Sequence, residues 1–176
     1  MNKLSIFFFS FVLVACGSLK TTFDYDKSVD FTKYKTFAFS AETDQLPVNE
    51  LVRKRIINAI KSSLQSKGLS EAPKADVLID LGVKTETKQQ TSANSVNMGG
   101  FYGRRWGFGT GFSTTQVNTT DYTEGTLVIN LVDAAKQELV WMGSGTATVT
   151  EKSVQQDKIE AAVTKILAKF PPAPKK

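Results

Sequence analysis

The stretch EGTLVINLVDAAKQELVWMG, at residues 124–143, decides how this chain folds. Every second residue from Leu127 to Leu131 is a large aliphatic one, which is the period of a β-strand, and the positions between them are also partly apolar. A strand that is apolar on both faces belongs in the middle of a sheet. Residues 133–138 are typical of a turn, and residues 139–150 alternate again. The stretch therefore predicts a central β-hairpin.

Further strands are expected before this hairpin in the sequence. Within the returning strand, Gly143 and Gly145 indicate either a β-bulge or a close approach of another segment. Toward the N-terminus, residues 75–87 alternate strictly and predict a second long strand. Aromatic and polar residues alternate over 22–26 and 34–39, which predicts two short strands.

Two amphipathic helices are expected to cover these strands. Apolar residues recur every three or four positions over 48–67, and Gly68 follows as a stop signal. The same spacing recurs over 154–170, after a Ser153–Gln156 capping box and before Pro171. The expected fold is a single α+β domain at 22–172, followed by a tail at 173–176. We expect a two-layer sandwich, a mainly antiparallel sheet with both helices packed on one face.

The first fifteen residues have the pattern of a signal peptide. Lys3 supplies a positive charge, and the eleven residues from Leu4 to Val14 are apolar or small. A helix needs about 20 apolar residues to cross a bilayer, so this run is too short for a membrane span. We expect residues 1–15 to be removed.

Residues Leu13 to Gly17 resemble a bacterial lipobox. The resemblance implies cleavage between Ala15 and Cys16, a diacylglyceryl group on the Cys16 thiol, and an acylated new amino terminus. Two or more acyl chains make a membrane anchor stable, and residues 16–21 would be the lipidated tether. No aspartate follows Cys16, which implies the outer membrane rather than the inner one. The sequence does not indicate which side of the membrane the domain faces.

Composition excludes several classes of function. The chain has no histidine and only one cysteine, so a Ser-His-Asp triad, a Cys-His pair and a thiolate metal cluster are all excluded. We therefore expect no catalytic residues, no metal and no cofactor. Without the leader the chain has 21 basic and 17 acidic residues, one Lys fewer than the 22 and 17 of the whole chain. This mild charge is spread along the sequence, so no nucleic acid partner is expected.

Several motifs together resemble the bacterial lipoproteins that carry domain of unknown function 4136. The resemblance covers almost the whole mature chain, and it implies a fold and a location but no activity, cofactor or catalytic residue. The chain departs from the family at Asn130, often Asp, and at Met142, often Arg. The motifs are Tyr34-x-Thr-Phe-Ala-Phe39, Lys67-Gly68, Ala75-Asp76-Val-Leu-Ile79, Glu124-Gly-Thr-Leu-Val-Ile-Asn-Leu-Val-Asp133, Leu139-Val-Trp-Met-Gly143 and Phe170-Pro171.

Acidic residues offer a weak alternative, a carboxylate-dependent hydrolase. Asp76 and Asp80 lie on one face of the predicted strand, but four residues of strand separate them by about 13 Å, beyond the distance used by glycosidases. The acids at 24, 26 and 30 lack the pattern of a Ca²⁺ loop. Structural or surface roles are favoured for all five.

The stretch 92–113 is a predicted loop of unusual composition, with six of the twelve glycines between 98 and 112. It is either a mobile connection between two strands or a contact loop. In the second case its aromatic rings would anchor a partner and its arginines would pair with anionic groups. The candidate contact residues are Phe101, Tyr102, Arg104, Arg105, Trp106 and Phe108.

Three functions are therefore open from the sequence. The first is a non-enzymatic, lipid-anchored protein of the cell envelope that binds an envelope protein, lipid or glycan or has a structural role. The second is a carrier or sensor of a small apolar or glycan ligand. The remote third is the hydrolase.

Overall fold

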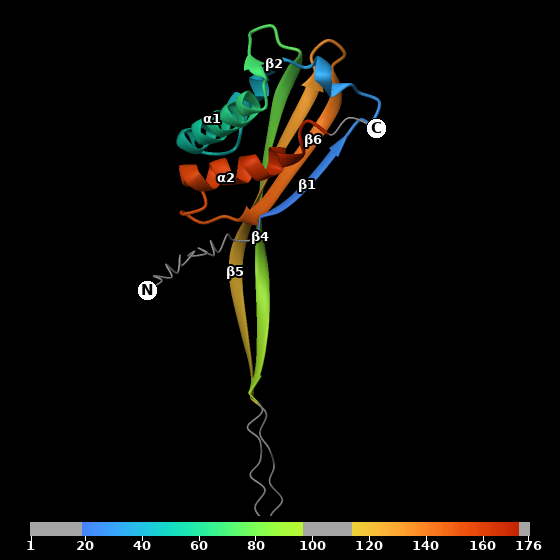
Figure 1. Cartoon of the computed structure of the whole chain (residues 1–176). Coiled ribbons are helices and arrows are strands. Elements are labelled where there is room, and N and C mark those ends of the chain that lie inside the picture. Colours follow the sequence, from blue (N-terminus) through green and yellow to red (C-terminus); the bar gives the residue numbers. More distant parts are fainter. Residues whose placement is uncertain (1–18, 97–113, 173–176) are drawn as a thin grey trace, which may run out of the picture.

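The computed structural model describes residues 19–96 and 114–172, with side-chain burial described outside 92–96 and 114–118. It is an α+β fold in which a mixed sheet has the strand order β1-β6-β5-β4-β2-β3. Both helices lie on the same side of the sheet (Figure 1). The elements are β1 Lys20–Tyr25, β2 Thr36–Phe39, α1 Glu50–Ser66, β3 Ser70–Glu71, β4 Val77–Val96, β5 Thr114–Asp133, β6 Glu138–Thr148 and α2 Gln156–Ile166, with short 3-10 turns at Phe31–Lys33, Ala41–Gln45 and Leu167–Lys169.

The sheet is mixed, so the prediction of a mainly antiparallel sheet is wrong in this respect. The strands β1, β6, β5 and β4 pair antiparallel, as a meander requires. By contrast, β2 pairs in parallel with both β4 and β3. The reason is the connection: α1 carries the chain from β2 back to the same end of the sheet, and such crossovers join parallel strands.

The hydrophobic core lies between the helices and one face of the sheet. Trp141, Phe37 and Phe170 are its largest buried side chains, and the rings of Trp141 and Phe170 meet edge to face with centroids 5.5 Å apart. The strands β4 and β5 contribute alternate residues to this face, as the sequence predicts. Those from the two central strands are Val77, Ile79, Leu81, Ile129 and Leu131, and the helices add Val52, Ile56, Ile60, Leu64, Ile159, Val163 and Ile166.

The helix ends differ in how well the sequence predicts them. Asn49 caps α1 by accepting a hydrogen bond from the Val52 amide, and Gly68 follows the helix with a φ of 90°, which favours glycine. The predicted capping box before α2 is wrong. Gln155 is the N-cap and its side chain makes no capping bond, whereas the Ser153 hydroxyl bonds the backbone of Thr150.

The two glycines of β6 mark a close approach, one of the two alternatives that the sequence offered, and not a bulge. A Cβ on Gly143 would lie 2.9 Å from Ile166, and one on Gly145 would lie 2.7 Å from the same side chain. The register shift falls instead between Leu131 and Val132 of β5. Glycine at 143 and 145 therefore lets α2 pack directly on the sheet.

The strands β4 and β5 are much longer than predicted. They pair without interruption from Val77–Asp133 to Val96–Thr114, so residues 92–96 of the expected loop belong to β4. Figure 1 shows the two strands running far beyond the helices as a two-stranded ribbon. We call Lys84–Val96 and Thr114–Thr126 the ribbon, and the rest of the domain the body. Within the described ranges, no helix has both the length and the apolarity to cross a membrane.

Candidate functional site

Most residues singled out from the sequence lie outside the described ranges. This holds for Ala15 and Cys16 and for the six candidate contact residues between Phe101 and Phe108. What the structure adds is their connection to described elements. The segment 97–113 joins the ends of the two ribbon strands, and Cys16 comes three residues before Leu19.

Asp76 has a structural role. One of its carboxylate oxygens, Oδ2, accepts hydrogen bonds from the Lys35 amide, the Thr36 amide and the Thr36 hydroxyl, each at 2.9 Å. These bonds to the ionised form hold the pKa of Asp76 below its usual value, the Lys35 amide contributing most. Asp76 thus ties the start of β2 to the start of β4.

Asp80 lies in a separate small network on the face of the sheet opposite the helices. Its carboxylate accepts hydrogen bonds from the Ser40 hydroxyl at 3.4 Å and from the Asn130 amide at 3.3 Å. An aspartate at 130 would set a second carboxylate against Asp80, so the departure to Asn130 fits its neighbour. The Oδ1 of Asn130 is buried and has no partner among the described atoms.

Asp26, Asp30 and Asp133 serve turns. The carboxylates of Asp26 and Asp30 accept from Ser28 and from Thr32 two residues later, and Asp133 accepts from the two amides of the β5–β6 turn at 2.9 Å. Asp133 also accepts from the Tyr34 hydroxyl at 2.9 Å. Burial and this bond raise the pKa of Tyr34. In the described residues, no three Cys, Asp or Glu side chains gather where they would hold a metal ion.

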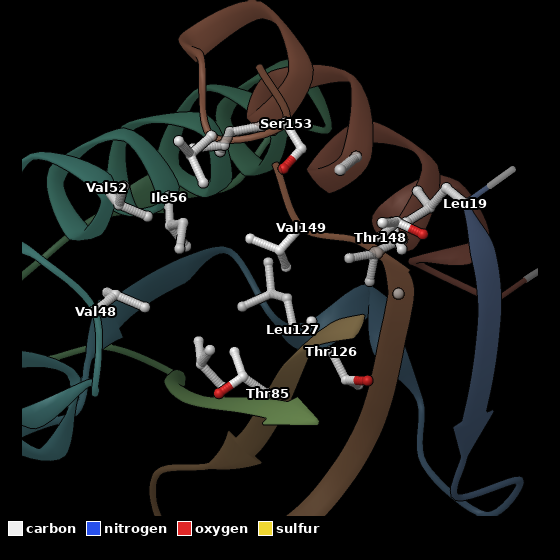
Figure 2. A pocket seen from close by; sticks show the side chains of 18 residues that line it. Leu19, Val48, Val52, Ile56, Thr85, Thr126, Leu127, Thr148, Val149 and Ser153 are labelled. Atoms are coloured by element: carbon white, nitrogen blue, oxygen red, sulfur yellow. The ribbon is translucent and has the colours of Figure 1, made fainter. Parts of the chain in front are cut away.

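The structure reveals an apolar pocket that the sequence does not predict. It lies at the end of the helix layer nearest the ribbon, between α1, α2 and the sheet, and has a volume of about 180 Å³. In Figure 2, Val52 and Ile56 of α1 face Leu127 of β5 across it. Leu19, the first described residue, lies at one end beside Thr148.

The lining of this pocket is almost entirely hydrocarbon. None of its lining side chains is charged, and its polar groups are the hydroxyls of Thr85, Thr126, Thr148 and Ser153. The Thr126 hydroxyl is bonded to Thr146, and that of Ser153 to Thr150. Pockets of this character bind apolar groups.

Residues 149–155, which join β6 to α2, form a strap over the pocket. The amide of Val149 donates to the Thr123 carbonyl at 2.7 Å, and the Arg55 guanidinium donates to the Val154 carbonyl at 2.8 Å. Val149 projects toward Leu127 in Figure 2 and is 37% exposed. A Cβ on Gly125 would overlap a Val149 methyl group, so glycine there lets the strap lie close to β5.

Small lining residues are a local signal by which the sequence could have shown this pocket. They are Gly125 of β5, Gly145 and Ala147 of β6, and Ala162 of α2. Because they come from three separate elements, their proximity follows only from the fold.

The ribbon presents a second candidate site, made of backbone edges. β2 pairs with β4 only as far as Ile79, and β6 pairs with β5 only from Glu124 onward. Beyond these points each ribbon strand has one edge with no partner strand in the described part of the chain. Ion pairs between Lys84 and Glu86 and between Lys88 and Glu124 decorate its exposed surface. Unpaired strand edges are templates for pairing with another strand.

Comparison with known proteins finds a matching family and similar folds. The family model described as domain of unknown function (DUF4136) matches residues 21–172. No curated protein matches the chain. Among solved structures, it is similar to a PDZ domain protein from Parabacteroides distasonis, with 19% identity and a TM-score of 0.54 over 88% of this chain. That match covers 35% of the PDZ domain protein, so the chain spans about a third of its length.

A second similar structure is a dodecamer of PelC from Paraburkholderia phytofirmans. The TM-score is 0.51 and the identity 13%, with 86% of this chain and 95% of that one covered. At these identities the likeness shows a shared fold only.

Proposed function

This chain belongs to the family described as domain of unknown function (DUF4136), and from this premise we propose that it is a lipid-anchored, non-enzymatic binding protein of the bacterial cell envelope. In this proposal the ribbon is the arm that reaches a partner, and the body is the base that holds it.

The observation that carries the proposal is the extension of β4 and β5 beyond the body. An isolated two-stranded hairpin is at best marginally stable in water, so the ribbon adds little to the stability of the fold. Its described side chains from Lys84 to Thr91 are all exposed. A long pair of strands with open edges and no core to cover is suited to contact another molecule by strand addition or through its tip.

The segment at the tip is one that the sequence analysis interprets as either a mobile connection or a contact loop, and the proposal takes the second alternative. The segment 97–113 carries Phe101, Tyr102, Trp106 and Phe108 together with Arg104 and Arg105. Aromatic and arginine side chains are the residues most often responsible for binding energy at interfaces. The ribbon would carry this segment away from the body, toward an envelope protein, lipid or glycan.

The test of the arm is affinity capture from the organism's own membranes. A chain in which residues 89–121 are replaced by Asn-Gly keeps the pairing of Lys88 with Tyr122 and closes it with a two-residue turn. We expect this chain to lose partners that the intact chain retains. A chain with Arg104→Ala, Arg105→Ala and Trp106→Ala keeps the ribbon and tests the tip alone. Equal capture by the intact and shortened chains would contradict the role of the ribbon.

The anchor is tested separately, by replacing Cys16 with Ala. The proposed lipid attachment at Cys16 predicts that the wild-type chain incorporates labelled fatty acid and sediments with the outer membrane. The Cys16→Ala chain should incorporate none. Labelling that persists in this variant would exclude Cys16 as the attachment site.

A second candidate function, a carrier or sensor of a small ligand, is favoured by the pocket. The lining has no charged group and few free polar groups, so it suits an apolar ligand and not a glycan, whose hydroxyls would lose their hydrogen bonds. Thermal unfolding in the presence of envelope lipids tests it, because a ligand that binds the folded state raises the melting temperature. A panel of fatty acids that causes no shift would argue against this candidate.

A further inference from the structure

The apolar pocket lies close to the point where the chain enters the fold. Leu19 lines it, and the strand β1 begins at the next residue. Cys16 is three residues before Leu19, and three residues of extended chain span at most about 11 Å. A group attached to Cys16 is therefore held within a short distance of the pocket.

The pocket and the acyl group proposed on Cys16 match in chemistry. The pocket offers aliphatic side chains on all sides, among them Val48, Ile159 and Ile166, and no charge to hold a head group. Its volume of about 180 Å³ is close to that of an engineered cavity of about 150 Å³ that binds benzene. It is large enough for part of an alkyl chain and too small for a whole lipid.

Attachment to the same molecule also favours an acyl chain on Cys16 over a free lipid as the occupant of the pocket. A short tether raises the effective concentration of the attached group near its site to the millimolar range. A free fatty acid would have to compete with a group that is always present.

We propose that the pocket holds the end of an acyl chain carried by Cys16 of the same molecule, an inference that rests on the lipid anchor proposed above. The strap at 149–155 covers the chain, with Val149 against it and Leu127 beneath. The other acyl chains on Cys16 remain free to enter the membrane. The acylated domain thus has one acyl chain that is sheltered from water and held against the domain's own core.

The experiment is photo-crosslinking within the full-length, lipidated chain. Cells are grown with a fatty acid that carries a photoreactive diazirine, and the protein is irradiated in the membrane, purified and digested. We expect crosslinks from the modified Cys16 peptide to peptides of β5 and α2 that line the pocket, such as those containing Leu127 and Ala162.

Neighbouring alanines of α2 supply a matched pair of variants. Ala162 lines the pocket, whereas Ala161 is exposed. The change Ala162→Phe fills the pocket and should reduce the crosslink at least several-fold, and Ala161→Phe should leave it unchanged. If Ala162→Phe does not fold, Val149→Asp places a charge against the pocket, and Leu139→Asp, at a site 53% exposed on the β5–β6 hairpin, is its control.

The outcomes separate this inference from the anchor. Labelled Cys16 without crosslinks to the pocket would overturn the inference and leave the anchor in place. Crosslinks that join the pocket to a free phospholipid would also overturn it, since the occupant would then be a different lipid. A Cys16 without any label would overturn the anchor and the inference together.

Discussion

The strands β4 and β5 each run through two regions, the body and the ribbon, which differ in their side chains and in the elements packed beside them. In the body, their inward residues are Val77, Ile79 and Leu81 opposite Leu131 and Ile129, all buried under the helices. In the ribbon the same two strands continue with the same pairing, but threonine, glutamine and charged residues replace the aliphatic ones.

The difference shows what each kind of residue contributes. The ladder between β4 and β5 extends through all twenty residues of each strand, so the pairing of these two strands with each other does not distinguish the regions. Only the body has alternating apolar residues, and only there do helices cover the sheet (Figure 1). Burial of apolar surface supplies most of the folding free energy, which indicates that the body determines the stability of the domain.

The largest effect on stability is expected from the centre of the body. Trp141 is fully buried and packs on Phe170, so Trp141→Ala should lower the free energy of unfolding by about 3–5 kcal/mol. Leu139, two residues earlier in β6 and 53% exposed, is the control, and Leu139→Ala should change it by about 0.5 kcal/mol or less. Urea unfolding followed by far-UV circular dichroism measures the free energy of unfolding of both variants, because this signal reports the backbone and not the tryptophan. Similar losses in the two variants would contradict this view of the core.

A smaller effect is expected where α2 meets the sheet. Gly143→Ala would push a methyl group against Trp141 and Ile166, which should cost about 1–3 kcal/mol. Gly82, in β4, has only the Val128 Cβ at 3.7 Å from an added methyl group. Gly82→Ala should therefore be neutral or stabilise by up to about 1 kcal/mol. A comparison of the two melting temperatures tests whether close packing explains the glycine in β6.

The third effect concerns the link between β2 and β4 and depends on pH. Asp76→Asn weakens three hydrogen bonds to a carboxylate and should cost about 1 kcal/mol at pH 7. Because the folded state lowers the pKa of Asp76, its contribution is present above the unfolded value of about 3.9 and is lost as the pH falls through the lower folded value. The difference between wild type and variant should therefore shrink below about pH 4. A difference that stays constant in acid would show that ionisation of Asp76 is unimportant.

The smallest effect on stability should follow the largest change in sequence. Replacing residues 89–121 by Asn-Gly removes most of the ribbon and none of the residues that form the core. We expect the free energy of unfolding to change by less than about 1 kcal/mol, since a two-stranded hairpin is at best marginally stable alone. Urea unfolding of the shortened chain measures this. A loss of several kcal/mol would mean that the ribbon supports the body after all.

The same contrast explains how much of the fold the sequence could reveal. The helix α1 and the body halves of β4 and β5 were predictable, because apolar residues repeat there with a regular period. The ribbon half was not, because its described residues from Lys84 to Thr91 are exposed on both faces and leave no alternation to detect. Two-residue β3 is too short for any period to be visible.

The candidate sites were predictable to a lesser degree. Composition drew attention to the segment around Trp106, which connects the ribbon strands, but the structure does not describe it. The pocket was missed because its lining comes from α1, α2 and three strands, and a hydrophobic pattern looks the same whether it leaves a space or fills it. The parallel pairing of β2 was missed for a related reason, since pairing depends on where α1 returns the chain.

The position of β4 and β5 in the middle of the sheet has a mechanical consequence. A force applied at the far end of the ribbon pulls both strands along their own direction, so it acts in shear on the ladders that join them to β2 and β6. In shear, many hydrogen bonds resist together instead of opening one after another. The start of β1 lies level with the base of the ribbon, because Lys20 pairs with Thr146 and Thr146 with Thr126, so a pull between the N-terminus and the ribbon would run through the β1–β6 and β6–β5 ladders.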